Sequence, residues 1–587
     1  MGKLINLRHL DISDTSLKEM PMGMEGLKRL RTLTAFAVGE DRGAKIKELR
    51  EMSHLGGRLC ISKLQNVVDA MDVFEANMKG KERLDELVMQ WDGDATARDL
   101  QKETTVLEKL QPHNNLKELT IEHYCGEKFP NWLGEHSFTN MVSMQLHDCK
   151  NCSFLPSLGQ LGSLKELSIM RIDGVQKVGQ EFCGNIGSSS FKPFEALEIL
   201  RFEKMLEWEE WVCREIEFPC LKELCIKICP KLKKDLPKHL PKLTKLEIRE
   251  CKQLVCCLPM APSIRELMLV ECDDVVVRSA GSLTSLASLD IRNVCKIPDE
   301  LGQLNSLVKL SVSGCPELKE MPPILHNLTS LKHFCLLSCS EMGLPPMLER
   351  LQIIHCPILK SLSEGMIQNN TTLQQLYISC CKKLELSLPE DMTHNHYAFL
   401  TQLNIFEICD SLTSFPLAFF TKLEYLHITN CGNLESLYIP DGLHHVELTS
   451  LQSLEISNCP NLVSFPRGGL PTSNLRRLGI RNCEKLKSLP QGMHPSLHPF
   501  NICIYLVVQK LIHFQKEVCP LIYLTFTSGI ATNSWLVGWS GACKRYPFLE
   551  RWRLKDMRKK DFPTRDFCPP LSPSFKLGFS KSEIPGQ

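Results

Sequence analysis

One short frame of aliphatic residues recurs through most of this 587-residue chain and restricts its fold more than any other feature. The frame reads Leu-x-x-Leu-x-Ile-x-x-Cys-x-x-Leu, as at residues 221–232. Other clear copies begin at Leu243, Leu307, Leu373, Leu423, Leu451 and Leu475, with weaker ones between them and upstream. The frame advances by about 23 residues per step, an interval typical of solenoid proteins.

The spacing within the frame predicts a short strand in every repeat. Leucine and isoleucine two residues apart share one face of a strand, while the intervening residues face the other way. One repeat buries about five aliphatic side chains, worth roughly 1.5–3 kcal/mol each, whereas ordering about 23 residues costs on the order of 1.5 kcal/mol per residue. A repeat therefore cannot fold alone, and stacking joins the strands into one parallel sheet. The predicted fold class is an α/β solenoid, a horseshoe with the parallel β-sheet on its concave face and a mostly irregular convex side.

Cysteine is abundant, with 28 residues. Such a number can indicate a disulfide scaffold, but those scaffolds are usually short secreted chains. Eleven cysteines, called the slot cysteines below, occupy one position of the frame just after the strand: Cys149, Cys229, Cys251, Cys272, Cys315, Cys339, Cys356, Cys381, Cys431, Cys459 and Cys483. A small thiol there can be buried against the next repeat while donating weakly to a carbonyl. The slot cysteines are therefore predicted to be structural and reduced.

The charge balance argues against some classes of partner. The chain has 69 basic and 68 acidic residues, a formal net charge of +1, whereas nucleic acids and anionic membranes favour a basic surface. No run of 18 apolar residues predicts a membrane span, and the first residues lack an apolar segment of signal-peptide length. The expected location is cytoplasmic. Four glycosylation motifs, at Asn151, Asn327, Asn369 and Asn370, would suit secretion, but such short motifs arise by chance.

The rhythm of the repeat suggests three regions. Residues 1–110 contain the first repeat units and an irregular helical insertion near 68–80, where Val68, Met71, Phe74 and Met78 have helical spacing. Residues 111–495 form the main solenoid. Residues 496–587 lose the frame and are predicted to be a non-repeat tail, disordered or an artefact of the gene model. Because the chain opens inside the repeat pattern, Met1 is not expected to begin a complete architecture.

The segment Glu-Trp-Glu-Glu-Trp at 207–211 has two interpretations. Its acidic and aromatic residues could form a binding patch. The interpretation we favour is an outer loop whose indoles pack on the solenoid.

Several motifs extend beyond the frame. They are Leu-Gln-Pro-His-Asn-Asn-Leu-Lys-Glu-Leu at 110–119, Phe-Pro-Asn-Trp-Leu at 129–133, Leu-Pro-Ser-Leu-Gly-Gln-Leu at 155–161 and Val-Gly-Gln-Glu-Phe at 178–182. With these motifs, residues 1–495 resemble the leucine-rich-repeat region of plant coiled-coil nucleotide-binding disease-resistance proteins, which are intracellular immune receptors. The family also carries a coiled coil and a nucleotide-binding switch domain, and neither has a counterpart here. No Gly-x-x-x-x-Gly-Lys-[Ser/Thr] motif occurs, so no nucleotide or other cofactor is predicted.

Enzymatic activity is not predicted. Cys149 and Cys152 with His147 are the best metal candidates, but one Cys-x-x-Cys pair is a weak signal, and Cys149 already has a place in the repeat. The sequence contains no nucleophile elbow and no His-Glu-x-x-His motif.

The residues between the buried positions of each strand are the expected binding surface, because solenoid curvature places them on the concave face. The candidates for partner binding are Lys245, Glu247, Arg249, Asp290, Arg292, Arg350, Tyr377, Phe406, Tyr425, His427, Arg477 and Arg481. Aromatic residues and arginine are enriched at binding hot spots, although aromatic residues also simply favour strands.

These observations predict a protein-recognition module. The resemblance implies that its partners are a pathogen effector or a host protein, and that it helps to restrain the switch domain of a parent receptor. Two alternatives remain: an extracellular repeat ectodomain that binds a peptide or glycan, and a non-functional receptor fragment.

Overall fold

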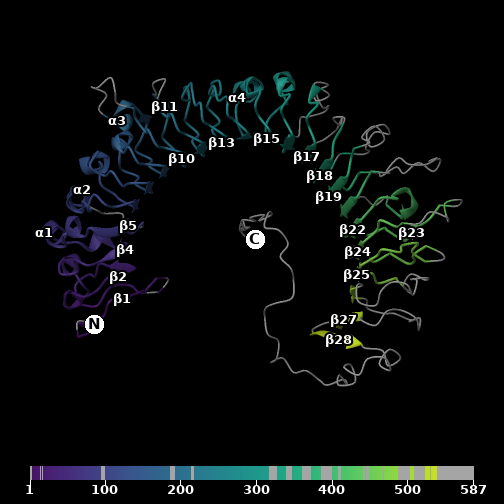
Figure 1. Cartoon of the computed structure of the whole chain (residues 1–587), viewed down its shortest axis with the longest axis horizontal. Coiled ribbons are helices and arrows are strands. Elements are labelled where there is room, and N and C mark those ends of the chain that lie inside the picture. The colour runs from purple at the N-terminus through teal and green to yellow at the C-terminus, as the bar shows by residue number, and fades with distance from the viewer. Residues whose placement is uncertain are drawn as a thin grey trace, which may run out of the picture.

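The computed structural model describes most of the repeat region. The described residues are 3–13, 15, 17–93, 99–184, 192–212, 217–315, 327–338, 347–357, 359, 372–384, 399–407, 412–440, 443, 448–466 and 469–486, with the backbone of three more strands between 503 and 537. They form an open arc with strands along its inner side and turns and short helices along its outer side (Figure 1). The predicted α/β horseshoe solenoid is confirmed. Cys339 and most of the predicted tail lie outside the described residues.

One long sheet runs along the inner side of the arc, and its strands follow one another in chain order. Successive strands are parallel and in register, so that Leu246 lies beside Leu267 of the next strand. The strands are β3 (Ala35–Ala37), β4 (Gly56–Ser62), β5 (Arg83–Gln90), β6 (Glu118–Glu122), β7 (Ser143–His147), β8 (Glu166–Met170), β10 (Ile199–Glu203), β12 (Glu223–Lys227), β13 (Lys245–Arg249), β14 (Glu266–Val270), β15 (Ser288–Arg292), β16 (Lys309–Ser313), β17 (His333–Leu337), β18 (Arg350–Ile354), β19 (Gln375–Ser379), β20 (Gln402–Phe406), β22 (Tyr425–Thr429), β24 (Ser453–Ser457) and β25 (Arg477–Arg481).

The sheet continues beyond the predicted end of the solenoid. β26 (Cys503–Val507) pairs in parallel with β25. β27 (Ile522–Ser528) pairs with β26 in parallel and with β28 (Ala531–Val537) in antiparallel fashion. Three shorter parallel pairs lie outside this sheet: β1 (His9–Leu10) with β2 (Thr32–Leu33), β9 (Lys177–Val178) with β11 (Glu210–Trp211), and β21 (Ser414–Pro416) with β23 (Ser436–Tyr438).

Side chains alternate along the strands as the frame predicts. In β13, Leu246 and Ile248 are buried, whereas Lys245, Glu247 and Arg249 face the concave side. The buried rows of all repeats join into one continuous core that extends along the arc. Stacking therefore supplies the burial that a single repeat lacks.

From β6 to β25, the residue after each strand of the long sheet turns the chain inward through the left-handed backbone region. Its φ is 54° at Glu250, 54° at Asn293 and 55° at the β-branched Ile228. The backbone N–H at this position donates to the last carbonyl of the next strand, as from Ile228 to Arg249 at 2.9 Å.

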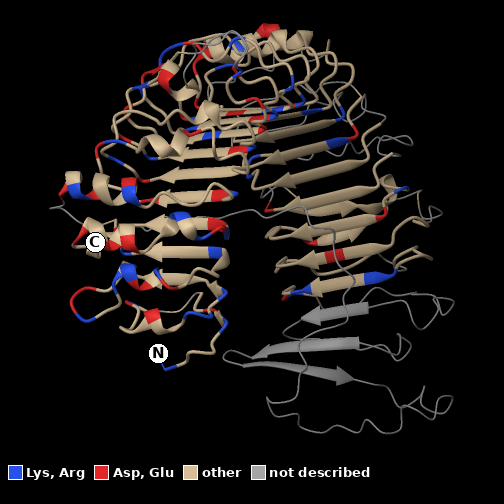
Figure 2. Cartoon of the chain, turned by 60° about the vertical axis from the view of Figure 1, so that its left-hand side comes forward, with Lys and Arg blue, Asp and Glu red and all other residues tan. Residues whose placement is uncertain are grey.

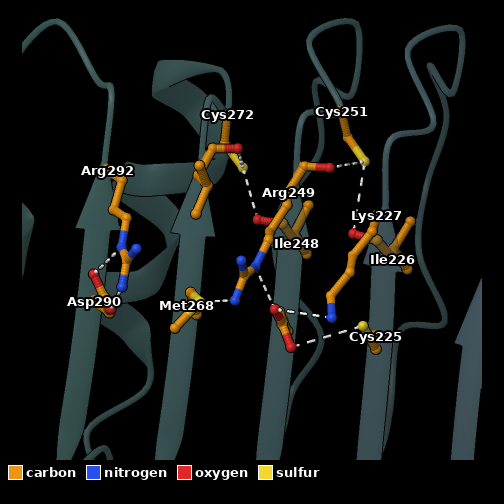
Figure 3. A network of polar contacts seen from close by, with 12 residues as sticks. Cys225, Ile226, Lys227, Ile248, Arg249, Cys251, Met268, Cys272, Asp290 and Arg292 are labelled. Atoms are coloured by element: carbon orange, nitrogen blue, oxygen red, sulfur yellow. Dashed lines mark hydrogen bonds and ion pairs between the residues drawn. The ribbon is translucent and has the colours of Figure 1, made fainter. Parts of the chain in front are cut away.

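The slot cysteines come directly after this turn. Cys251 is fully buried, and its thiol donates to the carbonyl of Ile226 on the preceding strand at 3.9 Å and to that of Arg249 at 3.3 Å. Cys272 makes the corresponding contact with Ile248 at 3.5 Å (Figure 3). The predicted structural role is confirmed for these cysteines.

The convex side consists of turns and short helices. The α-helices are α1 (Ala70–Glu75), α2 (Leu100–Lys109), α3 (Gln180–Cys183) and α4 (Asp274–Ser279). The 3-10 turns are η1 (Met24–Gly26), η2 (Ile46–Leu49), η3 (Leu64–Asn66), η4 (Met78–Gly80), η5 (Asn131–Gly134), η6 (Leu158–Gln160), η7 (Ala280–Ser282), η8 (Asp299–Gln303) and η10 (Leu417–Phe419). The helix α2 was not predicted, although its N-cap is visible in the sequence. The carboxylate of Asp99 accepts hydrogen bonds from the backbone of Gln101 and Lys102.

The predicted helix near 68–80 is shorter than expected, because α1 covers only Ala70–Glu75. Asn77 has a φ of 48° and separates α1 from η4. Val68, Met71 and Phe74 are 79%, 52% and 66% exposed, so the apolar stripe inferred from their spacing does not pack on the solenoid. Met78 alone of the four predicted positions is buried.

The indoles of the segment 207–211 pack on the solenoid, as the favoured interpretation expected. Trp208 and Trp211 are buried, and the ring of Trp208 lies 4.7 Å from that of Phe202 of the sheet. The glutamates between and beside them form ion pairs with a lysine segment of the next repeat: Glu207 with Lys231, Glu209 with Lys233 and Glu210 with Lys234.

Candidate functional site

All twelve candidate residues lie on the concave face. We define the concave face as the first, third and fifth residues of the five-residue strands. These residues alternate with the buried second and fourth residues. The candidates come from seven strands: Lys245, Glu247 and Arg249 from β13, Asp290 and Arg292 from β15, Arg350 from β18, Tyr377 from β19, Phe406 from β20, Tyr425 and His427 from β22, and Arg477 and Arg481 from β25. Basic and acidic residues both occur along these strands (Figure 2). The structure does not bring the candidates into one cluster but divides them among separate groups.

The first group is a polar network centred on Glu247. Its carboxylate forms ion pairs with Lys227 of β12 at 3.3 Å and with Arg249 of its own strand. It also accepts a hydrogen bond from the thiol of Cys225 at 3.7 Å. The guanidinium of Arg249 donates further to the sulfur of Met268 at 2.9 Å (Figure 3). The charges of Lys227, Glu247 and Arg249 are therefore largely neutralised by ion pairs within the group.

Asp290 and Arg292 form a second, self-contained pair. Two nitrogens of the guanidinium donate to the two carboxylate oxygens at 3.0 and 2.7 Å (Figure 3). This fork geometry is the strong form of the contact. The carboxylate of Asp290 raises the pKa of Arg292.

The third group is an aromatic cluster formed by Tyr377, Phe406 and His427 from three neighbouring strands. The ring centroid of Phe406 lies 5.3 Å from that of Tyr377 and 4.8 Å from that of His427. Burial lowers the pKa of His427, and its Nε2 shares a hydrogen bond with the hydroxyl of Thr429 at 2.8 Å. Tyr425 lies on the same strand as His427 but in the first row, and it is 42% exposed. The structure thus brings three of these rings together, with Tyr425 beside them.

A basic row extends across β16, β17 and β18. Strand register places His333 between Lys309 and Arg350, all three at the first position of their strands. The Nδ1 of His333 and the Nε of Arg350 are buried and lack a hydrogen-bond partner among the described residues. Burial, together with the charge of Arg350, lowers the pKa of His333. Only Arg350 of this row was a sequence candidate. Aligning the weak repeats near 335 and 353 with the clear one at 307 would have found the other two.

The opposite charge predominates earlier on the concave face. The corresponding positions of β5, β6, β8, β10 and β12 carry the acidic residues Glu86, Glu118, Glu122, Glu166, Glu203 and Glu223. Arg201 partly compensates them through ion pairs with Glu166 and, at 3.9 Å, with Glu223.

The chemistry of the described residues offers no metal site. No group of three or more His, Cys, Asp or Glu side chains in that part of the chain could hold a metal ion. Cys152, one of the weak metal candidates, donates instead to the carbonyl of Gly126 at 3.3 Å. Within the same residues, no helix has the length and apolar composition needed to cross a bilayer.

The stacked parallel strands, the inward turn and the slot cysteines define this chain as a leucine-rich-repeat solenoid. Comparison with known sequences narrows the class. The sequence model of the family described as R13L1/DRL21 LRRs matches residues 46–172. A disease resistance protein of Arabidopsis thaliana is 33% identical over 76% of this chain and 40% of its own length. The RPP13-like protein 1 of the same plant, also a disease resistance protein, is 36% identical over 54% of this chain and 30% of its own length.

A third relative, the disease resistance protein RGA2 of Solanum bulbocastanum, is 30% identical over 50% of this chain and 27% of its own length. The chain belongs with the leucine-rich-repeat regions of plant disease-resistance proteins. It spans less than half the length of these curated relatives.

Solved structures of other leucine-rich-repeat proteins were also matched. A protein of Leptospira interrogans has 19% identity and a TM-score of 0.37, with 78% of this chain and 91% of that chain covered. The circular protein CroV588 has 13% identity and a TM-score of 0.39, with coverage of 85% and 82%.

Proposed function

We propose that this chain is the protein-recognition module of a plant intracellular immune receptor and that its concave face binds a pathogen effector or a host protein. The cluster of Tyr377, Phe406 and His427 is the observation that carries the proposal. Three half-buried rings from separate strands form a contiguous patch on the concave face, and aromatic residues are enriched at interface hot spots. Similarity to disease resistance proteins supplies the biological setting.

In a full-length receptor the same module would also contribute to restraining the switch domain. This part of the proposal rests on the family resemblance. The proposal also locates the chain in the cytoplasm and assigns it no catalytic activity.

The test removes the aromatic surface. Combined replacement of Tyr377, Phe406 and Tyr425 by alanine should leave circular dichroism unchanged, because none of the three belongs to the continuous core. Wild type and variant are used for affinity purification from infected plant tissue, with quantitative mass spectrometry. A protein retained by wild type should be reduced at least about tenfold on the variant, since removal of a hot-spot residue costs more than about 1 kcal/mol.

The convex face supplies a matched control. Exposed Phe154 and Val255 lie outside the concave face, and their replacement by alanine should retain the captured protein. Equal capture by the wild type and the aromatic variant would contradict the proposed site.

A further inference from the structure

The concave positions of β16, β17, β18, β19, β20 and β22 contain no aspartate or glutamate. We call these positions the carboxylate-free tract. It lies between the mutually paired charges of β12–β15 and Glu455 of β24, which pairs with Arg477 at 3.6 Å. Elsewhere on the concave face nearly every basic residue has a carboxylate neighbour, so among the described residues the tract is where positive charge remains uncompensated.

The tract has two chemically different margins. The first row carries Lys309, His333 and Arg350, side by side on adjacent strands. On the opposite margin the fifth row carries Leu337 and Ile354 in register. Ser379 follows on β19 and Phe406 on β20, where the ring of Phe406 lies 5.3 Å from that of Tyr377 in the third row. Four residues along a strand separate the margins by roughly 13 Å, and the six strands span about 24 Å.

Glu349 and Glu407, at the border of the tract, have partners outside the basic row, although Glu349 also interacts electrostatically with His333. Glu349 forms an ion pair with Lys332 at 2.7 Å, and Glu407 accepts a hydrogen bond from the thiol of Cys380 at 3.6 Å. Neither Lys309 nor Arg350 forms an ion pair with a carboxylate among the described residues, and the buried Nε of Arg350 has no hydrogen-bond partner there. The ammonium of Lys309 and the guanidinium of Arg350 can therefore form charge-assisted hydrogen bonds with an incoming carboxylate.

From this complementarity we infer that the tract binds an extended acidic segment of a partner protein that alternates carboxylate and apolar side chains. Successive side chains of an extended segment point to opposite sides. A segment that runs along the arc, across the strands, would direct its carboxylates to the basic row and its apolar side chains to the Leu337–Phe406 margin. The inference rests on the proposed function and adds the chemistry of the partner.

A nucleic acid is the other ligand that basic and aromatic residues could bind. The six glutamates on β5–β12 argue against it, because they share the concave face and would repel a long polyanion. A short acidic segment can remain within the tract and avoid them.

The experiment uses defined probes and the whole chain. Fluorescence anisotropy compares a labelled peptide of about eight residues with alternating Glu and Phe or Leu, the same peptide with Gln for Glu, and an oligothymidylate. The acidic peptide should bind at least about tenfold tighter than the glutamine peptide, the worth of one hydrogen bond to a charged group. Salt should reduce this difference.

Charge removal within the tract is the decisive variant. Combining Lys309→Gln with Arg350→Gln should abolish the preference for the acidic peptide and leave the affinity for the glutamine peptide unchanged. The matched control combines Lys233→Gln with Lys234→Gln on the convex side, where both lysines pair with glutamates. It removes the same net charge and should retain the preference.

Four outcomes would overturn the inference: no measurable binding of the acidic peptide, equal affinity for both peptides, a preference that survives the tract variant, or tighter binding of the oligothymidylate. These failures differ from failure of the proposed function. If the aromatic triple variant still loses its partner in plant tissue, the concave face is a recognition surface and only the acidic chemistry is wrong.

Discussion

At the scale of single residues, Ile228 has a backbone conformation that is unfavourable for a β-branched residue. It has a φ of 55° in the turn after β12, where other repeats place Asn293, Asn430, Asn458 or Asn482. Asparagine visits the left-handed region routinely, whereas for other residues the region costs roughly 1–2 kcal/mol. Ile228→Asn should therefore raise the free energy of unfolding by about 1 kcal/mol, measured as a higher urea midpoint.

A second substitution at the same position separates backbone strain from lost packing. Ile228→Val keeps the β-branch and removes one methyl group from a partly buried side chain, so it should lower stability by about 0.5 kcal/mol, the low end of the range for buried sites. An Ile228→Asn chain that is no more stable than wild type would show that the isoleucine side chain contributes more than its backbone costs.

Lys81 gives the chain a pH dependence at the same scale. The side chain is buried, and among the described residues its Nζ donates to the carbonyls of Leu49 at 2.8 Å and Met52 at 3.2 Å. Burial lowers the pKa of Lys81 from 10.5 to about 8. Between these two values the unfolded chain binds more protons than the folded chain, so this lysine makes stability rise with pH there.

Lys81→Met should remove that rise. The free energy of unfolding should lose up to about 1.4 kcal/mol per pH unit of positive slope between pH 8 and pH 10, measured by urea unfolding at several pH values. The exposed neighbour Lys79 is the control, because Lys79→Met should leave the slope unchanged. If both variants keep the slope of wild type, another group causes it.

At the scale of elements, the strands could be predicted from sequence, whereas of the convex helices only α1 was predicted, and with longer bounds than it has. The two-residue period of a strand predicts that Leu246 and Ile248 are buried. The same period recurs in every repeat, so each copy supports the assignment of the others. On the convex side no neighbouring copy constrains the chain. There, a single residue such as Asn77 in the left-handed region ends α1 and leaves Phe74 in solvent despite its helical spacing.

The cysteines allow a prediction at this scale because the fold, and not the residue type, sets their reactivity. Adjacent Cys256 and Cys257 make a matched pair: Cys256 is buried and Cys257 is exposed. Burial raises the pKa of Cys256 to about 11 and that of the slot cysteine Cys272 to about 12. Iodoacetamide at about pH 8 should modify Cys257 at least about tenfold faster than Cys256 or Cys272, because the thiolate is the reactive form.

Peptide mapping by mass spectrometry measures the labelling, with urea-unfolded protein as the control in which all three react. Disulfide-linked peptides, or similar rates at the three positions of the folded chain, would favour the extracellular alternative over a reduced, cytoplasmic module.

At the scale of the whole molecule, the candidate site could be predicted only in part. Strand alternation alone was enough to place all twelve candidates on the concave face. Contacts between repeats depend on register, and the repeats differ in length. The approach of Tyr377 to Phe406 and the alignment of Lys309 with His333 therefore emerge only once the strands are paired.

The solenoid also determines how far the loss of stability caused by a core substitution extends along the chain, because each repeat contacts mainly its neighbours. Leu310→Ala removes a fully buried side chain of β16, at a cost of about 2–5 kcal/mol. Amide hydrogen exchange should then accelerate on the order of a hundredfold in β15, β16 and β17, with little change in β5–β8. Leu119→Ala in β6, a buried leucine at the equivalent position, should give the reverse pattern. If either substitution accelerates exchange equally along the whole arc, the sheet unfolds as one cooperative unit. A substitution in β5–β12 would then also change the stability of the carboxylate-free tract on β16–β22.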